Sequence, residues 1–127
     1  MNTKGFSEEQ KSALTELLVL GMYRDRHLAS SEDERVKLLV ASFDLPSEYT
    51  RQQFIDAAFA RVNKHPQTPE ALRSAVFASA AQFKTEAHRR QALDALAELL
   101  ASDNKVTTEE NTFLVMVEEA LELRKTR

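Results

Sequence analysis

Apolar residues recur at helical spacing through most of this 127-residue chain, and that spacing is the feature that most restricts its fold. Leu14, Leu17, Leu18 and Gly21 follow the i, i+3, i+4, i+7 pattern that places side chains on one face of an α-helix. Only two glycines and three prolines interrupt the chain, so helix is expected nearly throughout. The sequence predicts an all-α single domain. Four further stripes have the same spacing: Phe54, Ile55, Ala58, Phe59 and Val62; Leu72, Ala75, Val76 and Ser79; Leu93, Leu96, Leu99 and Leu100; and Phe113, Leu114, Val117 and Leu121.

Capping residues set the expected limits of the helices. The spacing of a capping box, in which a hydroxyl and an N3 side chain each accept from the other residue's amide, occurs in Ser7 with Gln10, Thr50 with Gln53, and Thr107 with Glu110. Beside the second pair, Tyr49 and Phe54 stand at the positions of a hydrophobic staple. Two more helices are expected to begin at an N-cap threonine, which is Thr68 before Pro69 in one and Thr85 in the other. We expect a single compact bundle of about six to seven helices, of which six can be placed, near 8–24, 31–43, 50–63, 69–81, 86–102 and 108–123.

The chain carries an internal repeat at an offset of 78 residues. This offset places Asp25 on Asp103 (103 − 25 = 78) and Glu32 on Glu110, so both ends read helix, D-x-x-[L/V]-x-x-x-E, helix. Such a duplication predicts two helical hairpins related by a pseudo-twofold axis, with residues 46–90 supplying the middle helices. Apolar positions coincide as well: Leu18 with Leu96, Met22 with Leu100, Leu28 with Val106, Val36 with Leu114, Leu39 with Val117, Phe43 with Leu121, and Leu45 with Leu123.

This repeated unit resembles the TerB-like family, an all-helical domain named for tellurite-resistance proteins and also found fused to chaperone-type and other bacterial modules. The resemblance covers roughly residues 12–45 and 90–123. In that family the loop commonly reads D-G-x-I-x-x-x-E, and the acidic residues of the two units are implicated in binding metal ions. Here Arg26 and Asn104 replace the family glycine; asparagine tolerates a left-handed backbone, whereas arginine does so poorly. Carried over by position, the implied metal ligands are Asp25, Glu32, Asp103 and Glu110, whose hard oxygens select calcium, magnesium or manganese.

The same acidic residues also have an explanation that involves no metal. An aspartate that follows a helix accepts hydrogen bonds from loop amides, and a glutamate three residues after an N-cap completes a capping box. Thr107 and Glu110 fit that description in the second unit, where Val106 would anchor the loop to the core. In the first unit Ala29 replaces the capping threonine, so Glu32 has no such partner. Metal binding and helix capping are both open interpretations.

Several kinds of chemistry are excluded by the composition. The chain has no cysteine, which excludes disulfides, a thiolate nucleophile and cysteine-ligated metal. An EF-hand is excluded because Lys105 occupies the third ligand position and no glycine follows at the sixth. His27, His65 and His88 are dispersed and lack the spacing of a zinc site, although His27 lies within the first acidic loop. No nucleophile elbow, P-loop or dinucleotide fingerprint is present, so we do not expect an enzyme.

Charge and hydropathy restrict the partners. Seventeen basic and twenty acidic residues give a formal net charge of −3 without a basic stripe, so nucleic acid is not expected. The start, MNTKGF, has no hydrophobic signal core, and LLVLGMY is too short to span a bilayer. We therefore expect a cytoplasmic protein with no membrane partner.

The function that the resemblance implies is a non-enzymatic, stress-associated bacterial accessory domain that binds a divalent cation as its cofactor. The alternative is a helical protein-interaction module in which the acidic loops are purely structural. A hydrophobic content of 43% also allows a homodimer through the middle helices. A partner surface is to be sought at the aromatic residues off or at the edge of the main stripes, which are Phe6, Tyr23, Tyr49, Phe77 and Phe83.

Overall fold

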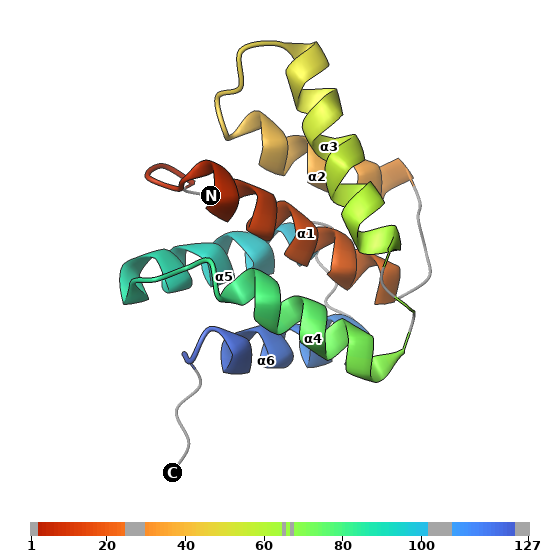
Figure 1. Cartoon of the computed structure of the whole chain (residues 1–127), viewed down its shortest axis with the longest axis vertical. Helices are drawn as coiled ribbons and strands as arrows, with labels where there is room; N and C mark the ends of the chain where they lie inside the picture. The colour runs from red at the N-terminus through yellow and green to blue at the C-terminus, as the bar shows by residue number, and fades with distance from the viewer. Residues whose placement is uncertain (1–2, 25–29, 65, 67, 102–107, 124–127) are drawn as a thin grey trace.

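The computed structural model describes residues 3–24, 30–64, 66, 68–101 and 108–123. Within these ranges all the regular structure is helical, as the sequence predicts, and no helix is long and apolar enough to cross a membrane. The helices form one compact bundle (Figure 1). Their bounds are α1 (Glu8–Arg24), α2 (Ser30–Ala41), α3 (Glu48–Asn63), α4 (Pro69–Ala80), α5 (Glu86–Leu100) and α6 (Thr108–Ala120).

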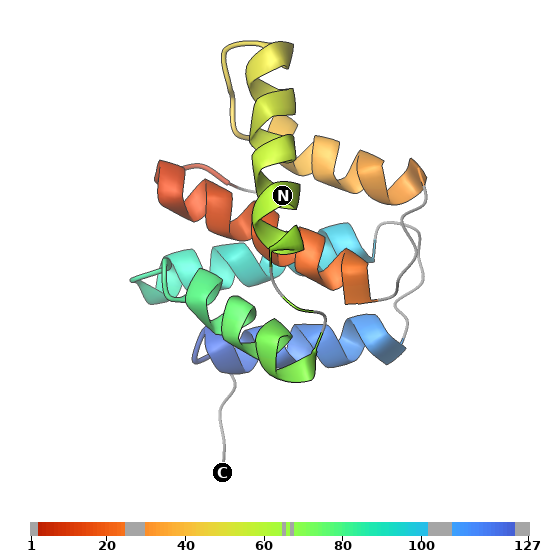
Figure 2. The same ribbon diagram turned by 45° about the vertical axis from the view of Figure 1, so that its right-hand side comes forward.

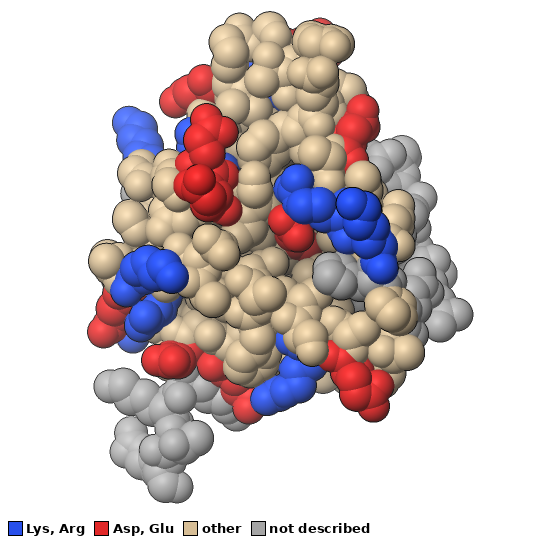
Figure 3. All heavy atoms as spheres, viewed as in Figure 1, with Lys and Arg blue, Asp and Glu red and all other residues tan. Residues whose placement is uncertain are grey.

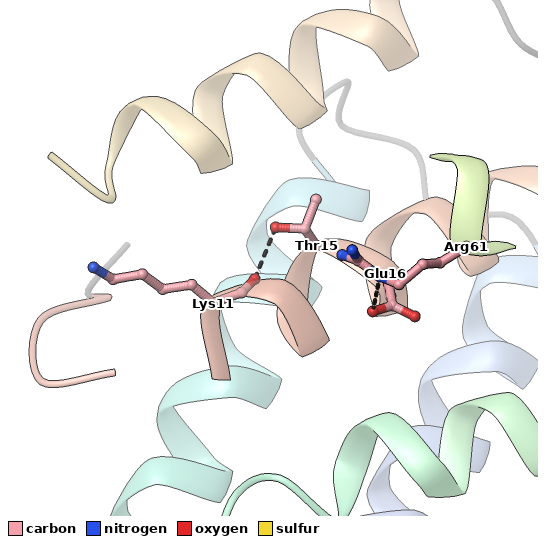
Figure 4. Close-up of polar contacts among 4 residues, drawn as sticks. All are labelled: Lys11, Thr15, Glu16 and Arg61. Atoms are coloured by element: carbon pink, nitrogen blue, oxygen red, sulfur yellow. Dashed lines mark hydrogen bonds and ion pairs between the residues drawn. The ribbon is translucent and has the colours of Figure 1, made fainter. Parts of the chain in front are cut away.

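Helix α1 lies in the middle of the molecule. It contacts all five other helices, with α2 and α3 on one side and α4, α5 and α6 on the other (Figures 1 and 2). Leu14 and Leu17 are fully buried, and so are Thr15 and Val19, so burial surrounds this helix instead of following one stripe. The buried Thr15 hydroxyl donates to the carbonyl oxygen of Lys11 at 2.8 Å (Figure 4), which satisfies the polar group within its own helix. A helix whose buried residues extend well beyond one stripe belongs at the centre of a bundle.

The other predicted stripes face the core that surrounds α1. In each of α3, α4, α5 and α6 the stripe residues are buried or partly buried. The fully buried members include Ala58, Val76, Leu96, Phe113 and Val117. Apolar periodicity therefore predicted which face of each helix turns inward.

Three of the predicted N-caps are confirmed. At α1, the Gln10 amide donates to Ser7 Oγ at 3.1 Å, and the Ser7 amide donates to Gln10 Oε1 at 2.9 Å, which is the predicted capping box. The caps of α4 and α5 each accept from the amide three residues along, at 3.1 Å: Thr68 from Ala71 and Thr85 from His88. The third predicted capping box begins at Thr107, which lies outside the described residues, so it stays a prediction.

Helix α3 begins earlier than the sequence analysis predicted. Its N-cap is Ser47, whose Oγ accepts from the Thr50 amide at 3.1 Å, so the prediction that Thr50 caps this helix is wrong. The predicted staple of Tyr49 on Phe54 is wrong for the same reason, because Tyr49 now lies inside the first turn and is 71% exposed. The Tyr49 hydroxyl instead accepts from Gln53 Nε2 at 2.9 Å. Serine is at least as good an N-cap as threonine, so the earlier residue begins the helix.

Helices α2 and α6 end two and three residues before their predicted limits, at Ala41 and Ala120. Each is followed by a residue with a left-handed backbone, Asp44 with φ of 58° and Glu122 with φ of 59°. A left-handed residue just beyond a helix satisfies its last carbonyl groups and turns the chain away. After α6, for example, the Leu123 amide donates back to the Glu118 carbonyl oxygen at 2.9 Å.

Candidate functional site

The four predicted metal ligands belong to the regions where α1 is followed by α2 and α5 by α6. Asp25 and Asp103 lie outside the described residues, and Glu32 lies in the first turn of α2 with its side chain outside the described part. Glu110, in the first turn of α6, is described and is 5% exposed. Convergence of the four carboxylates therefore stays a prediction.

The helix ends that flank these regions share one side of the molecule. The C-terminal end of α1 and the N-terminal ends of α2 and α6 lie on the right-hand side in both Figure 1 and Figure 2. Helix α1 contacts both α2 and α6, and α5 contacts them as well. The two acidic units, by which we mean the repeated D-x-x-[L/V]-x-x-x-E segments that begin at Asp25 and Asp103, therefore join neighbouring helix ends.

One buried ion pair joins the beginnings of α2 and α6. Arg35 Nη1 donates to Glu110 Oε2 at 3.4 Å, and the two side chains are only 6% and 5% exposed. A carboxylate removed from water to this extent needs positive charge or strong hydrogen bonds, since an unpaired buried ion costs several kcal/mol. Arg35 supplies that charge from the second turn of α2.

Sequence reasoning missed Arg35, although the sequence contains a signal for it. Arg35 precedes Leu39 by four residues and Phe43 by eight, so it lies in line with the buried stripe of α2. The offset of 78 also places it on Phe113 (113 − 35 = 78), which is fully buried. A charged residue on a buried stripe requires a partner. The identity of that partner, Glu110 on a distant helix, cannot be read from periodicity.

The chemistry of Glu110 fits a hard divalent cation. An ionised carboxylate has two oxygens with about four acceptor sites, so a hydrogen bond from Arg35 to Oε2 is compatible with cation coordination. Within the described residues, no three histidine, aspartate or glutamate side chains are grouped so that they could hold a metal ion. A metal site at Glu110 therefore depends on the other implied ligands, Asp25, Glu32 and Asp103.

A second feature is a groove of about 470 Å³ between α1, α3 and α4, lined by charged, polar and small apolar side chains. Its walls include Glu8, Glu9 and Ser79, and it is bordered by an ion pair in which Arg61 Nε donates to Glu16 Oε2 at 2.7 Å (Figure 4). On the face shown in Figure 3, acidic and basic side chains are interspersed. A lining of this kind differs from the largely apolar walls of typical small-molecule pockets.

The aromatic residues considered for a partner surface divide into two groups. Phe6 and Phe83 are buried and pack edge to face, with ring centroids 5.3 Å apart, so both belong to the core. Tyr49 is 71% and Phe77 37% exposed. The side chain of Tyr23 lies outside the described part.

The histidines share no site in the described part of the chain. His27 and His65 lie outside the described residues. His88 is half-buried in the first turn of α5, and its ring lies 5.4 Å from that of Phe6. That contact gives His88 a packing role.

Comparison with known proteins identifies the family. The model of the family described as tellurite resistance protein TerB matches residues 11–127. The match includes both acidic units and every helix, apart from the first three residues of α1. No curated protein and no solved structure shows significant similarity to the chain. Because the family model matches far more than half of the sequence, the chain belongs to the tellurite resistance protein TerB family.

Proposed function

We propose that this protein is a non-enzymatic accessory domain of the tellurite-resistance type that binds a divalent cation where its two acidic units meet. The proposed ligands are Asp25, Glu32, Asp103 and Glu110. The observation that carries the proposal is the ion pair of Glu110 with Arg35, since it ties the second acidic unit to the helix that contains Glu32. The unequal charge supports it too, because four carboxylates exceed one guanidinium and a divalent cation relieves the repulsion among them.

We also propose that the two ends of the chain are equivalent hairpins related by a pseudo-twofold axis. The helix contacts support this, because α1 contacts α2 as α5 contacts α6, and α1 contacts α6 as α2 contacts α5. The left-handed residues support it as well, since Asp44 and Glu122 are separated by the same offset (122 − 44 = 78). Under such symmetry both acidic units contribute equally to one shared site.

The experiment that tests cation binding is thermal unfolding with and without millimolar calcium, magnesium or manganese. A cation that binds only the native state stabilises it by RT ln(1 + [L]/Kd), which is about 2.7 kcal/mol at a concentration of about a hundredfold Kd. In a domain of this size that gain raises the Tm by several degrees. The paired variant Asp25→Asn with Asp103→Asn should lose the cation-dependent rise and keep its helical content.

A matched control replaces two exposed aspartates of other helices, Asp56→Asn with Asp94→Asn, which changes the net charge by the same amount. This control should keep the cation-dependent rise. If no cation raises the Tm of the native protein, and the Asp25 and Asp103 variant is destabilised, the aspartates only fasten their loops and the cation proposal is rejected.

The exposed aromatic residues of the middle helices favour a second candidate function, a protein-interaction module that self-associates. Tyr49 on α3 is 71% exposed, and Phe77 on α4 is 37% exposed with the guanidinium of Arg73 4.6 Å from its ring centroid. Sedimentation equilibrium at high protein concentration should then give a dimer mass, which Tyr49→Ser with Phe77→Ser reduces to that of a monomer. Leu38→Ser, at an exposed leucine of α2, is the control and should stay dimeric. A native protein that is monomeric throughout rejects self-association.

A further inference from the structure

We propose that the groove between α1, α3 and α4 binds a linear polyamine, that is, an alkyl chain with an ammonium group at each end. The residues that line the groove all lie in the described part of the chain, and none of them is a ligand of the cation site proposed above. With a volume of about 470 Å³, the groove has the size of a small-molecule site. Its charge, the spacing of its carboxylates and a buried hydroxyl without a partner point to this class of ligand.

The charge of the groove favours a cation. Its lining residues include Glu8, Glu9 and Glu16 but only one basic side chain, Arg61, so three carboxylates against one guanidinium leave two negative charges unbalanced. Glu8 and Glu9, in the first turn of α1, form no ion pair with another described residue. A cleft lined mainly by one sign of charge concentrates ligands of the opposite sign.

The spacing of the carboxylates selects an elongated cation over a metal ion. Glu9, Ser12, Ala13 and Glu16 follow the i, i+3, i+4, i+7 pattern, so they share the face of α1 that forms one wall of the groove. Helical rise separates Glu9 from Glu16 by about 10 Å along the axis. Consistent with this separation, no three acidic or histidine side chains of the described residues are grouped so that they could hold a metal ion. A polyamine of matching length can place one ammonium group at each end of this wall.

The wall formed by α4 contains a buried hydroxyl without a partner. Ser79 lines the groove and is 8% exposed, yet its hydroxyl forms no hydrogen bond with another described residue. Among the described residues, every buried side-chain nitrogen or oxygen that is shut off from solvent has a hydrogen-bond partner, so the Ser79 hydroxyl must reach the open space of the groove. There it can accept from an ammonium N–H, which satisfies a polar group that burial otherwise makes costly.

The ion pair at one end of the groove leaves room for a ligand on the same carboxylate. Arg61 Nε donates to Glu16 Oε2 at 2.7 Å (Figure 4). An ionised carboxylate has about four acceptor sites on its two oxygens, so Glu16 Oε1 can accept from an ammonium group while Oε2 stays with Arg61. The ion pair also holds the carboxylate in place, which lowers the cost of ordering it around a ligand.

The experiment is isothermal titration of the full chain with spermidine in a buffer of low ionic strength. Glu8→Gln with Glu9→Gln removes both charges at one end of the groove and should raise the Kd by about tenfold or more. The matched control, Glu48→Gln with Glu70→Gln, removes two exposed first-turn glutamates of α3 and α4. It should change the Kd by less than about twofold, because neither residue lines the groove.

Ser79→Ala tests the hydroxyl with little risk to the fold. Alanine is the better helix former, so thermal unfolding should show equal or greater stability. The loss of a hydrogen bond to a charged ligand should nevertheless raise the Kd for spermidine by about tenfold. If Ser79→Ala binds spermidine as tightly as the native protein does, the ligand does not lie against α4 and the proposal is overturned.

Two diamines of equal charge test whether the ligand reaches both ends of the groove. Diaminooctane is long enough to extend from Glu9 to Glu16, whereas diaminobutane is too short, so diaminooctane should bind about tenfold more tightly. This advantage should shrink in the variant Glu8→Gln with Glu9→Gln, which keeps the contacts of the alkyl chain and removes the charge at one end. Equal affinities of the two diamines in the native protein would overturn the proposal.

The remaining outcomes separate this site from the alternatives. Asp25→Asn with Asp103→Asn should bind spermidine like the native protein, and a loss of binding there would move the ligand to the acidic units and overturn the proposal. A trilysine peptide that binds more tightly than spermidine would assign the groove to a basic protein segment instead. Absence of spermidine binding, or a control as weak as the variant Glu8→Gln with Glu9→Gln, would also overturn it. None of these results depends on whether a divalent cation binds, so the proposed function is judged separately.

Discussion

Gly21 of α1 lies directly against the ring of Phe113 on α6. A Cβ added at Gly21 would stand 2.9 Å from Phe113 Cε2, closer than real Cβ contacts allow, and 3.1 Å from its Cδ2, which is tighter than most. Phe113 is fully buried and Gly21 is buried too, so the ring cannot swing into solvent to make room. The glycine is required here by the approach of two helices.

The first prediction follows from that contact. In an exposed helix position, glycine to alanine would gain about 0.5–1 kcal/mol from the lower entropy of the unfolded chain. Gly21→Ala should instead destabilise the protein by about 1–3 kcal/mol, which is the usual cost of overpacking a core. Urea denaturation followed by circular dichroism measures the difference.

Phe113→Leu provides the control for Gly21→Ala, because it replaces the aromatic ring by a smaller side chain. In the Phe113→Leu background, the added methyl group has room, so its cost should fall and the two substitutions should not be additive. Full additivity, or a more stable Gly21→Ala, would show that the close approach is not what restricts this position.

The second prediction concerns the buried pair of Arg35 and Glu110. Arg35→Met and Glu110→Leu each remove one side of this buried ion pair, and because breaking a buried pair typically costs about 3–5 kcal/mol, each should destabilise the protein by about that amount. The double variant Arg35→Met with Glu110→Leu replaces both charged groups by apolar ones and should cost much less than the sum of the two single changes. Denaturant unfolding measures all of them, and a double variant as unstable as that sum would contradict the direct pairing.

The third prediction tests the start of α3. Ser47→Ala removes the side chain that accepts from the Thr50 amide, so it should cost about 1 kcal/mol. Thr50→Ala removes a first-turn hydroxyl that contacts Ser47 Oγ at 3.0 Å and leaves the acceptor of the Thr50 amide in place, so it should cost less than half as much. Thermal unfolding of the two variants ranks them, and the reverse order would place the cap at Thr50.

These helix starts show how far the sequence determines the fold. Each helix could be predicted, because apolar spacing and capping residues are local signals that need no knowledge of tertiary structure. The start of α3 was misplaced because two residues with capping chemistry, Ser47 and Thr50, lie three positions apart. Local chemistry alone ranks them too closely to choose.

The candidate site depends on contacts that local signals do not contain. Glu110 could be identified from its repeated spacing, but its partner Arg35 lies 75 residues earlier. An ion pair over that separation is determined by how α2 and α6 pack, and apolar periodicity specifies which face is buried without specifying what that face meets. Whether Asp25, Glu32 and Asp103 approach Glu110 is a question of the same kind, and it stays a prediction.

The last prediction tests the repeat through its two left-handed residues. Asp44 and Glu122 follow α2 and α6 with φ of 58° and 59°, a conformation that costs a non-glycine residue about 1–2 kcal/mol. Glycine adopts it without that cost but loses about 0.5–1 kcal/mol through the greater freedom of the unfolded chain.

Asp44→Gly and Glu122→Gly should therefore each stabilise the protein by up to about 1 kcal/mol. The gain should be larger for Glu122→Gly, because aspartate tolerates this backbone better than glutamate does. Ala57→Gly, at an exposed position within α3, is the control and should destabilise by about 1 kcal/mol. Equivalent ends of two equivalent hairpins must respond in the same direction, so a gain at one position with a loss at the other in denaturant unfolding would argue against the pseudo-twofold repeat.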